Sequence, residues 1–217
     1  MSKSSALERE QSREEELANG ISHGVGLIAA LAATPSLLSQ AMRSGETGFI
    51  IGVTLFATTM VLLYFASSLY HVLPPGNAKL TFKKVEHSAI FLLIAGTYTP
   101  FSLGVLRGPW GWTLLVLVWS LAIVGVVLKL CNRMTSPIVS TGFYLLMGWL
   151  VIVAVKPLVA LVPVSGLLWL VAGGLAYTVG VIFFAMDLRL RFGHFIWHLF
   201  VMAGTACHYC AVLWYAA

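Results

Sequence analysis

Apolar stretches recur along the whole chain, and short polar links separate them. Each stretch is about long enough to cross a hydrocarbon core of roughly 30 Å as a helix. Pro35 and Pro100 fall inside two of these stretches and are expected to kink them. The pattern predicts an all-α bundle of seven transmembrane helices, at residues 19–41, 48–71, 85–106, 110–130, 137–157, 163–185 and 194–216.

Composition supports a membrane protein. Of the 217 residues, 59% are hydrophobic and only 10% are charged, and the mean hydropathy is +0.91. These values do not fit a soluble surface. The first eighteen residues contain no apolar stretch followed by a small-residue cleavage site, so we expect no removable signal peptide. We predict a polar cytoplasmic tail over 1–18 and a single seven-helix transmembrane domain over 19–217.

Basic residues predict the orientation in the membrane. With seven spans, ten of the 13 lysines and arginines share one side with the N-terminal tail, and only Arg43, Arg107 and Lys156 fall on the other side. Because basic loops stay in the cytoplasm, we predict a cytoplasmic N-terminus and an external C-terminus. The formal charge of +5 then reflects topology and contact with anionic membrane lipids, and we expect no nucleic-acid partner.

Five polar residues stand out at the cytoplasmic helix ends. Ser67 and His71 lie in the last turn of the second predicted helix, Glu86 opens the third, and His194 and His198 occupy the first two turns of the seventh. Residues four apart lie on nearly one helix face, so His194 and His198 can both bind one ion. Ionisable groups are costly in a membrane and usually mark a functional site.

This combination predicts a zinc site. Three neutral imidazoles with one open position are typical of catalytic zinc, which lowers the pKa of bound water to about 7. Glu86 could orient or deprotonate that water, and Ser67 could bond to the water or to a substrate carbonyl. The H-x-x-x-H spacing alone is a weak signal, because it lacks the internal glutamate of H-E-x-x-H proteases. Alternatively, each histidine anchors or caps a helix at the interface.

Three further histidines have other expected roles. His23, at the start of the first predicted helix, either supports the site or packs at the interface. His87 points about 100° away from Glu86 on a helix and should face solvent or headgroups. His208 lies about 15 Å deeper than His198, which is too far to share its metal, and should be hydrogen-bonded inside the bundle.

Neither Asp187 nor the cysteines are predicted to be catalytic. Asp187 stands among Arg189 and Arg191, where a salt bridge is its expected role. The three cysteines are an odd number in helix-forming segments and show no disulfide framework, so we interpret them as small apolar packing residues: Cys131, Cys207 and Cys210.

Four segments carry a family resemblance: SSLYH (67–71), KVEHSAIFLLIAGTYTPF (84–101), GFYLLMGWL (142–150) and GHFIWHLFVMAGTACHY (193–209). Together they resemble the bacterial haemolysin III family, which belongs with the progestin and adiponectin receptors and, more distantly, the alkaline ceramidases. The likeness extends from ELANGISHGVG (16–26) to the last helix. It implies a seven-helix, multi-pass protein of the bacterial inner (cytoplasmic) membrane.

The resemblance also implies roles for the polar residues. By it, His71, His194 and His198 correspond to the zinc ligands, and Ser67 to the serine of the S-x-x-x-H motif. Glu86 stands where the family usually has aspartate, whose role in the receptors is to hold the zinc-bound water. One extra methylene could bring this carboxylate to the metal itself, which would close the site and make the zinc structural.

Three functional hypotheses follow. The first is a zinc-dependent hydrolase of a lipid amide or ester, acting in membrane-lipid homeostasis. The second is a non-enzymatic sensor or receptor of membrane state in which zinc is structural. The third is the cytolysin that the family name implies, which is disfavoured because the helices carry no polar stripe that would line a pore. A receptor for a protein hormone is also disfavoured, because the chain has no sizeable domain outside the membrane.

Overall fold

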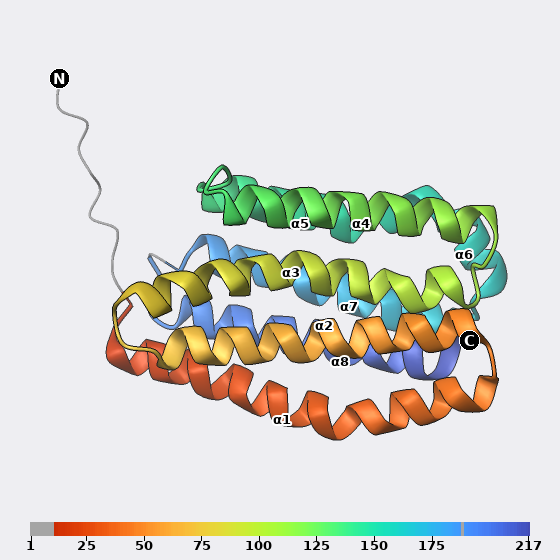
Figure 1. Ribbon diagram of the computed structural model, residues 1–217, viewed down its shortest axis with the longest axis horizontal. Coiled ribbons are helices and arrows are strands. Elements are labelled where there is room, and N and C mark those ends of the chain that lie inside the picture. The colour runs from red at the N-terminus through yellow and green to blue at the C-terminus, as the bar shows by residue number, and fades with distance from the viewer. Residues whose placement is uncertain (1–10, 188) are drawn as a thin grey trace.

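The computed structural model describes residues 11–187 and 189–217, and this part of the chain is helical with no strand. Its elements are α1 (Arg13–Ser44), α2 (Thr47–Val72), α3 (Asn77–Leu103), α4 (Pro109–Leu130), α5 (Pro137–Gly148), the 3₁₀ helix η1 (Trp149–Ala154), α6 (Val155–Leu161), α7 (Val164–Ala185) and α8 (Gly193–Tyr215) (Figure 1). Because α5, η1 and α6 follow one another without a gap, each of the seven predicted helices has a counterpart among the described residues.

Six of these segments are long and apolar enough to cross a membrane, with α5, η1 and α6 taken together as one. The helix that does not meet this composition is α3. Its first turns carry Lys79, Lys83, Lys84 and Glu86, which make this end of the helix polar. The multi-pass membrane character predicted from the sequence is therefore supported, with six clear candidate spans.

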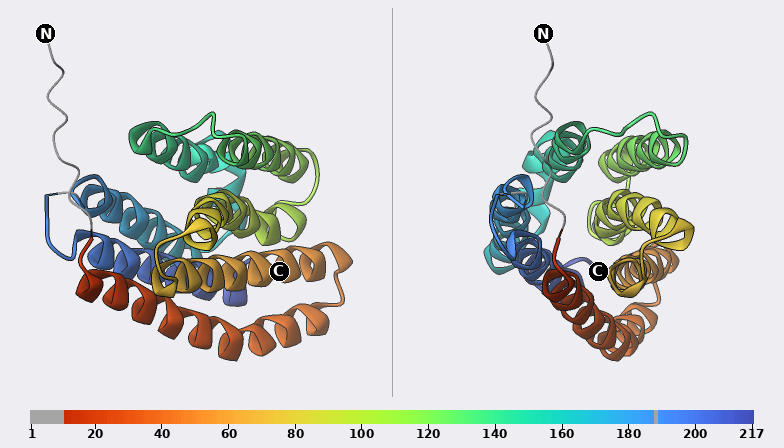
Figure 2. Two further views of the ribbon diagram at one scale, coloured as in Figure 1. Left: turned by 60° about the vertical axis from the view of Figure 1, so that its left-hand side comes forward. Right: turned by 90° about the vertical axis from the view of Figure 1, so that its left-hand side faces the viewer.

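The helices form a ring when the bundle is viewed end-on (Figure 2, right). α1 packs against α2 and α8, α2 packs on α3, α3 on α4, and α7 on α8. The start of α1 and the α2–α3, α4–α5 and α7–α8 connections gather at one end of the bundle, on the left in Figure 1. This end carries the polar groups that the sequence singled out.

The first helix begins earlier than predicted. Ser12 caps α1, because its side chain accepts from the Glu15 amide while the Glu15 carboxylate accepts from the Ser12 amide. This capping box starts the helix at Arg13, so residues 13–18 of the predicted tail are helical. Residues 1–10 of that tail lie outside the described residues. Pro35 lies inside α1, which is visibly bowed (Figure 1).

The predicted fifth helix is not a continuous α-helix. The Tyr98 hydroxyl of α3 donates to the carbonyl oxygens of Met147, at 3.0 Å, and Gly148, at 2.7 Å, and accepts from the Val151 amide at 2.9 Å. A side chain inserted into the backbone hydrogen-bond ladder in this way breaks a helix locally. The segment therefore passes through η1 before α6 resumes the helix and ends at Leu161, beyond the predicted end.

A close approach of backbones holds α2 against α3. A methyl group added at Gly52 would lie 2.7 Å from the Pro100 Cα, which is closer than carbon atoms pack. Only a residue without a side chain fits at this position. The contact fixes α3 alongside the helix that carries Ser67 and His71.

Candidate metal centre

Four side chains at the polar end of the bundle lie close enough to hold one metal ion. His71 of α2, Glu86 of α3, and His194 and His198 of α8 each offer a ligand atom, and these atoms lie within 4.8 Å of one another. The imidazole centroids are separated by 4.7 to 5.2 Å. All but the partly exposed His194 are buried. The structure thus brings together residues from three helices that are distant in sequence.

Three atoms of this cluster are buried without a hydrogen-bond partner: the Nε2 atoms of His71 and His194 and the Oε2 atom of Glu86. Buried polar atoms are nearly always paired, so each such atom calls for an explanation. Imidazole nitrogens and a carboxylate oxygen are suitable ligands for a transition metal such as zinc. The chemistry of these donors therefore fits a metal ion.

The other ring nitrogen of each histidine contacts an oxygen. The His71 Nδ1 lies 2.7 Å from Glu16 Oε2, the His194 Nδ1 lies 3.3 Å from Asp187 Oδ2, and the His198 Nδ1 lies 3.3 Å from the Asn19 carbonyl oxygen. Metal-binding histidines usually donate this second N–H to a carboxylate or a carbonyl, which leaves the Nε2 lone pair for the ion. All three rings have the contact that this arrangement requires.

Ser67 contacts the carboxylate of Glu86. Its hydroxyl donates to Glu86 Oε1 at 2.6 Å and lies 2.7 Å from His23 Nδ1. The hydroxyl was expected to bond to a water or a substrate carbonyl, whereas its hydrogen is committed to Glu86 in this structure. His23, for which the sequence left two roles open, also stacks on His198 with ring centroids 3.5 Å apart.

The other polar residues that the sequence singled out, His208, His87 and Asp187, are not among the four clustered residues. His208 Nε2 donates to the Leu170 carbonyl at 3.3 Å, as expected of a histidine bonded inside the bundle. His87 was expected to face solvent or headgroups, whereas it is half-buried and lines a cavity beside the cluster. Asp187 Oδ2 lies 3.3 Å from His194 Nδ1, and Arg191 donates to Glu14.

Sequence reasoning missed Glu16 and Asn19 as partners of the clustered histidines His71 and His198. Glu16 precedes the helix start that the apolar pattern predicted, and Asn19 coincides with it. Their spacing with His23, three and then four residues, is a signal that could have found them, because it places all three on one face of a helix.

An apolar cavity of about 400 Å³ adjoins the cluster. Glu86, His194 and His198 form part of its wall, and most of the remaining wall consists of aliphatic and aromatic side chains of α3, α5, α7 and α8. A ligand would therefore reach the buried cluster through a hydrophobic space. This shape suits a ligand with a hydrocarbon chain.

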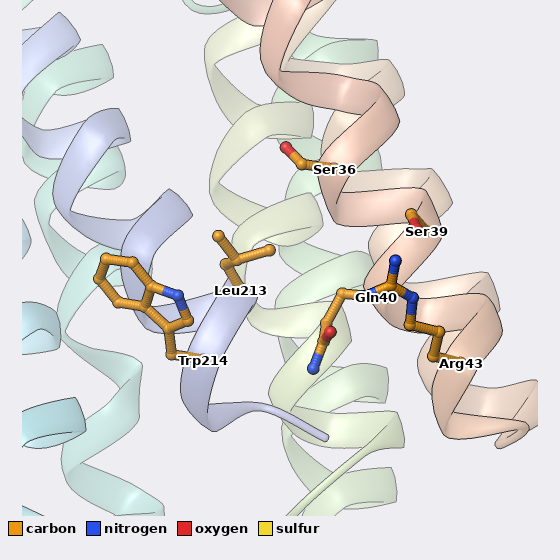
Figure 3. Close-up of a pocket in the computed structure, with 6 residues that line it drawn as sticks. All are labelled: Ser36, Ser39, Gln40, Arg43, Leu213 and Trp214. Carbon is orange, nitrogen blue, oxygen red and sulfur yellow. The ribbon is translucent and has the colours of Figure 1, made fainter.

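A second pocket lies at the opposite end of the bundle, between the last turns of α1 and α8 (Figure 3). Its volume is about 290 Å³. It contains no histidine, cysteine or carboxylate, and its lining residues are Ser36, Ser39, Gln40, Arg43, Leu213 and Trp214. It is therefore not a candidate for the predicted metal.

Comparison with known proteins gives the family. The profile described as "Haemolysin-III related" matches residues 11–209. The chain is 45% identical over 202 residues to Hemolysin-3 of Bacillus cereus, covering 93% of this chain and 92% of that protein. It is 44% identical to the Hemolysin-3 homolog of Bacillus subtilis (strain 168), covering 93% and 94%.

A human protein is also similar. The Monocyte to macrophage differentiation factor is 30% identical over 211 residues, which cover 91% of this chain and 83% of that protein. No solved structure matches the chain. The family profile spans most of the sequence and includes all four clustered residues, which confirms the relationship that the motifs indicated. The chain therefore belongs to the haemolysin III family.

Proposed function

We propose that this protein is a zinc-dependent hydrolase of a lipid amide or ester and acts in membrane-lipid homeostasis. The observation that carries the proposal is that Glu86, His194 and His198 line an apolar cavity while three buried atoms of the cluster lack hydrogen-bond partners. Zinc is the preferred ion because three imidazoles and a carboxylate suit it, whereas magnesium and calcium favour oxygen ligands.

His71, His194 and His198 would hold the ion. When bound, zinc supplies Lewis acidity, which polarises a carbonyl and makes water more acidic. Glu86 is placed to accept the proton of an attacking water, because Ser67 occupies its Oε1 atom and its Oε2 atom has no partner. The water oxygen would bond to the carbonyl carbon, and the bond from that carbon to nitrogen or oxygen would break with protonation of the leaving group.

The apolar cavity would bind the acyl chain of the substrate. Aliphatic and aromatic walls exclude water from the region around the scissile bond and so favour the directed attack of one water molecule. A lipid in the adjacent leaflet would present its headgroup linkage near the cluster, because the cluster lies at one end of the bundle.

The proposal includes a location and an orientation. We infer that the chain crosses the bacterial cytoplasmic membrane seven times, with α3 as the least apolar span, the N-terminus inside and the C-terminus outside. Lys79, Lys83 and Lys84 follow α2 at the cluster end of the bundle, and Lys129 and Arg133 flank the end of α4. Basic residues at this end support a position of the metal centre near the inner leaflet.

Lipid hydrolysis by the purified protein tests the proposal. Free fatty acid is measured after incubation with ceramides and phospholipids, before and after chelation and on return of zinc. We expect release that chelation stops and zinc restores, and a loss of about 10²- to 10⁴-fold in E86Q, which removes the proton acceptor. E46Q is the matched control, because Glu46 is exposed and pairs with Arg107. Absence of release from the whole panel would reject the hydrolase.

A structural metal in a membrane sensor is the second candidate. It is favoured by the position of Glu86, whose ligand atom lies within 4.8 Å of those of the three histidines, since four protein ligands close a zinc site. In that case zinc would bind at one equivalent per chain and raise thermal stability, without any lipid hydrolysis. Both candidates require that zinc is lost when His71, His194 and His198 are replaced by alanine.

A further inference from the structure

We propose that His23 is a positioning residue of the metal centre, which acts through Ser67 to orient the carboxylate of Glu86. The inference rests on the metal centre of the proposed function but does not depend on turnover. His23 is not one of the four clustered residues, and its side chain is buried. Its polar contact is with Ser67, and its ring packs against the rings of His198 and Tyr64.

The hydrogen bonds between these residues have one consistent direction. A hydroxyl carries a single hydrogen, and Ser67 gives it to Glu86 Oε1. At the other contact the hydroxyl oxygen must accept, so His23 Nδ1 carries the hydrogen and donates it over 2.7 Å. The sequence of donation runs from α1 through α2 to α3. A hydroxyl that is itself hydrogen-bonded in this way becomes a better donor to the carboxylate.

This direction fixes the carboxylate. One oxygen of Glu86 is held by a short bond to Ser67, and the oxygen without a partner is Oε2. Without the donor from His23, the Ser67 hydroxyl could rotate to another acceptor, and the carboxylate could turn about its terminal bond. The buried chain from His23 thus holds Oε1, which also lies 3.7 Å from the His71 Nε2 atom, and leaves Oε2 as the oxygen without a hydrogen-bond partner.

Packing fixes the ring of His23 itself. It lies parallel to the His198 ring, with centroids 3.5 Å apart and an interplanar angle of 5°. On another side the Tyr64 ring meets it edge-on at 5.1 Å. A side chain held on two sides has little rotational freedom, so its donor points at Ser67 without further loss of entropy.

Two substitutions separate the hydrogen bond from the packing. H23F keeps an aromatic ring beside His198 but removes the donor to Ser67. H23N retains an amide donor near the place of Nδ1 but removes the ring. The matched control is W119F, which likewise removes a ring N–H donor to a hydroxyl, the 3.1 Å bond from Trp119 to Thr99, at a site away from the cluster.

Cobalt(II) is the probe, because its visible absorption reports the geometry of its ligands. We expect H23F to change the absorption spectrum of the cobalt-loaded protein and to weaken cobalt binding by about 10- to 100-fold. H23N should restore most of the unaltered spectrum, and W119F should leave spectrum and affinity unchanged. If His23 acts by packing alone, H23F should keep the spectrum and cobalt affinity of the unaltered protein, and H23N should not. That result would overturn the proposal.

A double-substitution cycle with Ser67 tests the path of the effect. If His23 acts through Ser67, H23F should add no further change in S67A. Additive changes would overturn the proposed path. If H23F does not fold, H23Q is compared with H23N, since both lack the ring and only H23N keeps the donor near the place of Nδ1: a spectrum altered in H23Q alone supports the proposal, and equal spectra contradict it. If the unaltered protein binds no cobalt or zinc, the metal centre fails together with this inference, whereas binding that is insensitive to H23F rejects the inference alone.

Discussion

The three clustered histidines, His71, His194 and His198, contact oxygens that come from outside the cluster. Glu16 is the most informative of these partners, because its carboxylate contacts His71 Nδ1 at 2.7 Å and Lys79 Nζ at 3.0 Å. It is also largely shielded, with 23% of its side chain exposed. A carboxylate in this position fixes the ring orientation and would raise the basicity of the nitrogen that faces a bound metal.

Removal of this carboxylate should therefore weaken metal binding. We expect E16A to lower zinc affinity by about 10- to 100-fold, because His71 loses the acceptor of its Nδ1 hydrogen. Competition between the protein and a chromophoric zinc chelator measures the change. E14A is the control, since Glu14 is exposed and its ion pair with Arg191 is of the surface kind that contributes little. Equal zinc affinity in E16A and E14A would contradict the assignment.

The residues of the candidate site differ in how far the sequence could reveal them. His71, Glu86, His194 and His198 stand out because charged or ionisable side chains are rare in apolar helices. Glu16 does not stand out, since it lies in a polar segment that carries several other acidic residues. Only the capping box at Ser12, which extends α1 to Arg13, brings Glu16 onto a packed helix and against His71.

At the scale of elements, the long apolar stretches predict the helices well, because a helix that crosses a membrane must present a hydrophobic surface to lipid and to its neighbours. The exception is the fifth predicted helix, whose 3₁₀ segment depends on the hydroxyl of Tyr98, about fifty positions earlier in the chain. No local pattern within 137–157 contains that contact. Sequence reasoning therefore finds the element but not the interruption.

Packing between α2 and α3 gives an element-scale prediction. We expect G52A to lower the free energy of unfolding by about 1 to 3 kcal/mol, because the new methyl group would be forced against the Pro100 backbone. Thermal unfolding in detergent measures the loss. G142A is the control, since nothing lies within 4 Å of a methyl group at Gly142, and alanine favours the helix by up to about 1 kcal/mol. Equal melting of the two variants would show that α2 and α3 can separate without cost.

The whole molecule has two distinct ends. The polar end holds the α2–α3, α4–α5 and α7–α8 connections (Figure 1), and the clustered histidines lie there, in the last turn of α2 and the first turns of α8. At the other end, the Val105 amide, in the connection after α3, donates to the Ala216 carbonyl at 3.0 Å, so the C-terminus lies there. The proposed orientation therefore places Cys131, which is exposed just after α4, in the cytoplasm and Ala217 outside.

Thiol labelling with a membrane-impermeant maleimide tests this orientation in a C207S/C210S background. In bacterial cells whose cytoplasmic membrane is intact and whose outer layers let the reagent through, we expect no reaction at Cys131, because the reagent cannot reach the cytoplasmic end. Inside-out vesicles should label Cys131. In A217C with C131S added, the pattern should reverse, since residue 217 is exposed at the external end. Labelling of Cys131 from outside the cell would place the metal cluster at the outer leaflet and exclude inner-leaflet lipids as the source of substrate.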